Sequence, residues 1–64
     1  MVKKEIRDSI LKGINSGKKI VLPKDSEASP ELHVLSLLWN LALDEGDNVE
    51  RVDIATQLVR KLPS

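Results

Sequence analysis

The sequence contains no cysteine, phenylalanine or tyrosine, and it has one histidine and one tryptophan among its 64 residues. The absence of cysteine excludes disulfides, thiolate zinc sites and cysteine nucleophiles. With a single histidine, a multi-histidine metal site would need ligands from more than one chain. The three glycines, Gly13, Gly17 and Gly46, match neither a dinucleotide-binding motif nor a P-loop. We therefore expect no metal and no cofactor.

Catalytic residues are equally scarce. His33 and Ser36 lie three residues apart, so they can meet on one turn of a helix. A serine nucleophile also needs an orienting acid and an oxyanion hole, and the middle of a regular helix offers no free backbone N–H groups. The sequence thus predicts a protein that is not an enzyme.

A long hydrophobic run is also missing. The apolar segment from Val34 to Leu43 is broken by Ser36 and Asn40, and it is shorter than the roughly 20 residues that span a bilayer. The first residues alternate between charged and apolar types, unlike a signal peptide. The absence of cysteine fits a reducing compartment. We therefore expect a soluble, cytoplasmic protein that does not bind membranes.

What remains is the composition of a small folded domain, with 41% hydrophobic and 31% charged residues. A chain of this length forms one domain, here residues 1–64. A single core of this size rarely supplies more than about 3–5 kcal/mol. Because disulfides and metals are excluded, self-association is the remaining source of stability.

Apolar residues repeat with helical spacing in the first part of the chain. They recur every fourth residue over 2–15, which predicts an amphipathic helix that ends at Gly17 in a left-handed conformation. These residues are Val2, Ile6, Ile10 and Ile14. Residues 19–22 are rich in β-branched side chains and precede Pro23, so we expect a short extended segment there.

A second helix is predicted over residues 30–45. Ser29 is a favourable N-cap, Pro30 suits the first helical position, and Gly46 is placed to end the helix. The remaining polar residues of this helix form one line along it, a strip facing water or a feature that fixes dimer register. That line is His33, Ser36, Asn40 and Asp44.

A third helix is predicted over residues 48–62, with Asp47 or Asn48 as its N-cap and Pro63 after its end. We expect its core stripe to run along Val52, Ala55, Val59 and Leu62, widened by Val49, Ile54 and Leu58. The predicted fold class is therefore all-α or nearly so. It has three helices with one short extended segment between the first two.

The second helix is too apolar for one side of a monomer to cover. A helix on a small domain needs an apolar stripe of roughly 100°, and this one is apolar almost all the way round. We therefore expect it to be the central helix of a homodimer. The predicted interface residues are Leu35, Leu38, Trp39, Leu41 and Ala42. The expected function is that of a non-enzymatic, self-associating interaction or regulatory module, or of a subunit in a hetero-oligomer.

The charge is unevenly distributed although the formal net charge is zero. Residues 1–24 carry +5, residues 25–50 carry −7 and residues 51–64 carry +2. A basic N-terminal part suggests nucleic acid as an alternative partner, with Lys18, Lys19 and Lys24 as contacts.

The order of strand, helix and helix in residues 18–62 resembles that of ribbon-helix-helix repressors. The resemblance implies a dimer whose paired strands enter the major groove of DNA. Two features depart from that family: a helix precedes the strand, and the loop before Ser29 is longer.

Overall fold

The computed structural model describes residues 2–22 and 29–62, with side chains from residue 4 onward. It contains three helices, α1 (Val2–Ser16), α2 (Pro30–Glu45) and α3 (Asn48–Arg60), and the described residues form no strand. The prediction of an all-α fold is confirmed. Within the described residues, none of these helices is both long enough and apolar enough to cross a membrane.

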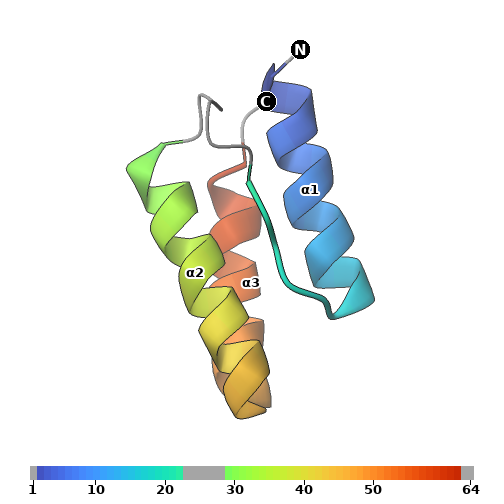
Figure 1. Ribbon diagram of the computed structural model, residues 1–64. Coiled ribbons are helices and arrows are strands. Elements are labelled where there is room, and N and C mark those ends of the chain that lie inside the picture. Colours follow the sequence, from blue (N-terminus) through green and yellow to red (C-terminus); the bar gives the residue numbers. More distant parts are fainter. Residues whose placement is uncertain (1, 23–28, 63–64) are drawn as a thin grey trace.

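Helices α2 and α3 pack side by side and run in opposite directions, and α1 lies beside them (Figure 1). After α1, residues 18–22 follow an extended path along the bundle (Figure 1). We call residues 18–22 the connector; they have no regular secondary structure. The three helices and the connector therefore enclose one small core.

Helices α1 and α2 end with the same C-terminal glycine motif. Gly17 has φ 64°, and the N–H of Lys18 donates to the Gly13 carbonyl at 3.0 Å. Gly46 has φ 70°, and the N–H of Asp47 donates to the Ala42 carbonyl at 2.9 Å. This is the Schellman arrangement, which satisfies carbonyls left free at the end of a helix. The predictions for Gly17 and Gly46 are confirmed.

The predicted N-caps are also confirmed. The Ser29 hydroxyl accepts a hydrogen bond from the N–H of Leu32 at 3.4 Å. The Asp47 carboxylate accepts one from the N–H of Glu50 at 3.0 Å, so Asp47 rather than Asn48 caps α3. The backbone N–H of Asp47 also donates to the Ala42 carbonyl of α2. Asp47 therefore takes part in both the C-terminal motif of α2 and the N-cap of α3.

Helix α3 ends at Arg60, two residues before the predicted position 62. Lys61 leaves the helical region with φ −102° and ψ 6°. Leu62 precedes a proline in the sequence, and the residue before proline disfavours helical backbone angles. Pro63 itself, like Pro23, lies outside the described residues.

The core draws on all three helices and on the connector. Ile6 and Ile10 of α1 are buried and Ile14 is half-buried, which confirms the predicted stripe at these three positions. The side chain of Val2 lies outside the described residues. Ile20 of the connector is buried as well, with 3% of its surface exposed. The remaining core residues are Leu32, Leu35, Trp39, Ala42, Ile54 and Leu58.

The predicted core stripe of α3 is wrong in part. Ile54 and Leu58 fill the core, with 2% and 0% of their surface exposed, whereas Val52 and Val59 are 68% and 50% exposed. Burying isoleucine and leucine removes more apolar surface from water than burying valine, so the helix turns its larger side chains inward. The valines are left on the outside of the bundle.

Candidate functional site

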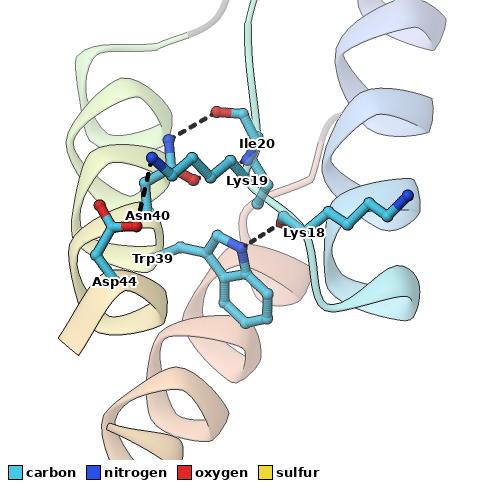
Figure 2. A network of polar contacts seen from close by, with 6 residues as sticks. All are labelled: Lys18, Lys19, Ile20, Trp39, Asn40 and Asp44. Carbon is cyan, nitrogen blue, oxygen red and sulfur yellow. Dashed lines mark hydrogen bonds and ion pairs between the residues drawn. The ribbon is translucent and has the colours of Figure 1, made fainter. Parts of the chain in front are cut away.

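Two consecutive residues of α2 hold the backbone of the connector (Figure 2). The indole N–H of Trp39 donates to the carbonyl of Lys18 at 2.9 Å. The side-chain oxygen of Asn40 accepts from the N–H of Ile20 at 2.7 Å, and its amide nitrogen donates to the carbonyl of Ile20 at 2.9 Å. Asn40 therefore offers Ile20 a donor and an acceptor, as a neighbouring β-strand would.

The polar line on α2 consequently has a different environment from the one expected. Asn40 is half-buried against the connector, and Ser36 has only 4% of its surface exposed. The interpretation of this line as a strip facing water is wrong at these two positions. A buried backbone N–H and C=O without partners would be costly, and the Asn40 amide satisfies both groups of Ile20.

The three lysines considered for nucleic-acid binding do not form one described cluster. Figure 2 shows the side chains of Lys18 and Lys19 pointing to opposite sides of the connector. The Lys19 ammonium lies 3.3 Å from the carboxylate of Asp44, and both side chains are well exposed. Lys24 lies outside the described residues. Part of the local positive charge is therefore neutralised within the chain.

The residues predicted for a dimer interface separate into two groups. Leu35, Trp39 and Ala42 lie in the core of the protomer, with 8%, 3% and 4% of their surface exposed. Leu38 and Leu41 are 43% and 54% exposed on the opposite side of α2. The interface itself stays a prediction, and only these two of its residues are available to a partner.

Two residues missing from that prediction complete the exposed side of α2. Val34 is 54% exposed and Leu37 is 67% exposed. With Leu38 and Leu41 they occupy one side of the helix, at intervals of three, one and three residues. We call these four residues the outer face of α2. Periodicity could have separated them from the residues of the inner side, but it does not say which side faces the core.

Each end of α2 carries an ion pair with another part of the chain. Glu31, at the N-terminal end, lies 2.6 Å from the ammonium of Lys61. Asp44, at the other end, pairs with Lys19 of the connector. Glu31 and Asp44 are thereby paired, whereas Glu45, the last residue of this helix without lysine or arginine, has no ion pair among the described residues.

The residues considered for chemistry line a shallow hollow of about 290 Å³ beside the connector. His33 and Ser36 both border it, but no hydrogen bond joins them in the described structure. The Ser36 hydroxyl is buried without a hydrogen-bond partner there. The described residues also contain no group of three or more histidine, aspartate or glutamate side chains placed to hold a metal.

In comparisons with known proteins, no family model, no curated protein and no solved structure matches the chain.

Proposed function

We propose that this protein is a non-enzymatic interaction module that forms a symmetric homodimer through the outer face of α2. The observation that carries the proposal is the presence of four large aliphatic side chains on one helix face, each between 43% and 67% exposed. Fully burying one such side chain contributes roughly 1.5–3 kcal/mol. A core this small gains more from that burial than a larger domain would.

The spacing of the outer face supports pairing with a second copy. The intervals of three, one and three residues are the same when read in either direction along the helix. A two-fold axis between Leu37 and Leu38 therefore places Val34 opposite the partner's Leu41, with two antiparallel helices in contact. An isologous interface brings the same patch of both subunits together in this way.

The charges at the two ends of α2 are compatible with antiparallel pairing. Such pairing brings the Glu31 end of one helix near the Asp44 end of the other. Two bare carboxylates would repel each other there, but Lys61 and Lys19 already pair with them. The dimer thus opposes two ion pairs, which lowers the like-charge penalty between Glu31 and the partner's Asp44, whereas the exposed Glu45 keeps its charge.

The test is the molar mass in solution, measured by light scattering after size exclusion. Wild type is expected to elute as a dimer, and Leu38→Glu as a folded monomer, because Leu38 is not part of the core. Val49→Glu is the matched control: it adds the same charge at an equally apolar position of α3 that is 83% exposed. The control is expected to remain dimeric.

A well-folded wild-type monomer at high concentration would contradict the proposal, as would a dimer of Leu38→Glu. Trp39→Glu behaves differently in this view, since Trp39 is 3% exposed and its loss should unfold the protomer. Adding random duplex DNA to the same measurement tests the alternative that the protein is a DNA-binding regulator. A mass increase that disappears with salt would favour nucleic acid as the partner.

A further inference from the structure

A second apolar surface lies along α3 and shares no residue with the outer face of α2. It is a hollow of about 610 Å³ bounded by α3, Ile14 of α1 and Trp39 of α2. Val52 and Val59 form its apolar wall and are 68% and 50% exposed, and Ala55 lies half-buried between them. We call this hollow the valine groove. It exists because α3 turns Ile54 and Leu58 inward instead of its valines.

The charged residues that line the valine groove are both arginines, Arg51 and Arg60. They lie nine residues apart on α3, which corresponds to about 13 Å along the helix axis. No aspartate or glutamate is among the lining residues. An apolar wall with a positive charge near each end favours a ligand that is apolar in the middle and acidic at both ends.

Arg51 adds an independent observation. Its guanidinium lies 5.8 Å from the centre of the Trp39 ring and donates to the side chain of Asn48. Its Nε atom is buried without a hydrogen-bond partner among the described residues, and no carboxylate of those residues lies within 4.0 Å. A half-buried cation in this situation gains strongly from a carboxylate, because charge-assisted hydrogen bonds are about twice as strong as neutral ones.

We propose that the valine groove binds an acidic amphipathic helix of a different protein. Aliphatic side chains of that helix contact Val52, Ala55 and Val59, and its carboxylates bind Arg51 and Arg60. Recognition of an amphipathic helix in a groove is a recurrent mode of peptide binding. The inference concerns another surface and does not depend on the proposed dimer.

Two other occupants fit less well. The outer face of α2 in a second copy is also apolar and acidic, but Glu31 and Asp44 are already paired with lysines. Among the described residues of α2 this leaves Glu45 alone to pair with the two arginines of the groove. The phosphates of a nucleic acid could bind the arginines, but they would make no favourable contact with the apolar wall of valine and alanine. A separate acidic polypeptide matches both the charges and the apolar surface.

The experiment uses a synthetic helical peptide that lacks tryptophan, with leucines on one face and glutamates two and a half turns apart. Trp39 is the only tryptophan of the protein and lines the groove, so its fluorescence reports binding directly. We expect a saturable change in emission with this peptide. The same peptide with lysine in place of glutamate is expected to bind at least roughly tenfold more weakly.

Variants inside and outside the groove test whether the peptide binds there. Arg60→Gln is expected to weaken binding by roughly tenfold, since it removes one charge-assisted contact at an exposed position. Val52→Ser removes part of the apolar wall and is expected to weaken binding as well. Arg7→Gln and Val49→Ser change an exposed cation and an exposed valine outside the groove, and both are expected to bind as wild type does.

Three results would overturn the inference: no saturable change with the glutamate peptide, equal binding of the lysine peptide, or unchanged binding by both Arg60→Gln and Val52→Ser. Polymers that Val52→Ser suppresses would show that a second copy occupies the groove instead. The monomeric Leu38→Glu variant should still bind the peptide. Failure of the dimer and failure of the groove are therefore distinguishable.

Discussion

The side chain of Ile20 lies directly against the backbone of Gly13. A β-carbon added at Gly13 would come within 2.5 Å of Cγ1 of Ile20 and 3.3 Å of the carbonyl oxygen of Lys18. Ile20 cannot move aside easily, because it is buried and both of its backbone polar groups are bound to Asn40. The glycine in the last turns of α1 is therefore the place where the connector can approach that helix.

Gly13→Ala is expected to destabilise the protein by about 1–3 kcal/mol, the usual effect of overpacking a core. This is the opposite of the normal result, since alanine is favoured over glycine in a helix by up to about 1 kcal/mol. Chemical denaturation measures the difference. In an Ile20→Ala background the same substitution should cost less, because only the contact with the Lys18 carbonyl remains close. An undiminished cost there would contradict the explanation by the Ile20 side chain.

Asn40→Ala is expected to lower the free energy of unfolding by about 2 kcal/mol, because it removes two hydrogen bonds to the connector. Asn15→Ala is the control, since Asn15 is exposed on α1. A change at position 40 no larger than in the control would mean that the connector is held by other contacts.

Asn40→Asp should make stability depend on pH. The protonated acid can donate to the carbonyl of Ile20, whereas the carboxylate cannot, so the fold raises the pKa of the introduced carboxyl. The folded state then binds more protons than the unfolded state, and stability falls as pH rises through that raised pKa. Denaturation of variant and wild type over a pH series should show a difference that is smallest in acid; a difference independent of pH would contradict this.

Ser36→Ala is expected to raise the free energy of unfolding by about 1 kcal/mol. It removes a buried hydroxyl that has no partner among the described residues, and such a group costs about 1–3 kcal/mol. Ser9→Ala on α1 measures how much of the gain comes from helix propensity alone. Equal gains at both positions, or a loss at position 36, would show that the hydroxyl has a partner in solution.

Gly46→Ala should cost about 1–2 kcal/mol for backbone reasons only, since nothing lies within 4 Å of an added β-carbon while φ is 70°. Gly46→Asn should cost less, because asparagine tolerates the left-handed conformation better. Thermal unfolding of the two variants gives the comparison. Equal losses would indicate that a steric contact, not the backbone angle, decides the effect.

Local signals in the sequence predicted much of this fold. Ser29, Pro30 and Gly46 mark the ends of α2 through the chemistry of single residues, and each behaves as expected. The repeat in α1 predicted the burial of Ile6 and Ile10 because only one side of that helix is apolar. Where a helix has only one apolar side, the local pattern is sufficient to predict which residues are buried.

The rest depends on a choice between alternatives that look alike in the sequence. Helix α2 is apolar on two sides, and only the position of α3 decides that Leu35 is buried while Leu38 is exposed. The same ambiguity misplaced the core stripe of α3. The role of Asn40 was also hidden, because its partner Ile20 lies twenty residues away and no helical spacing connects them.

The order in which the elements are made has a consequence for this arrangement. During synthesis α1 is made before α3, yet Ile6 and Ile10 share their core with Ile54 and Leu58 of α3. The short link between α2 and α3 lets these two helices pack against each other early, whereas the isoleucines of α1 stay exposed to solvent until α3 is present. Until α3 has been made, nascent chains therefore expose the apolar face of α1 to chaperones and proteases.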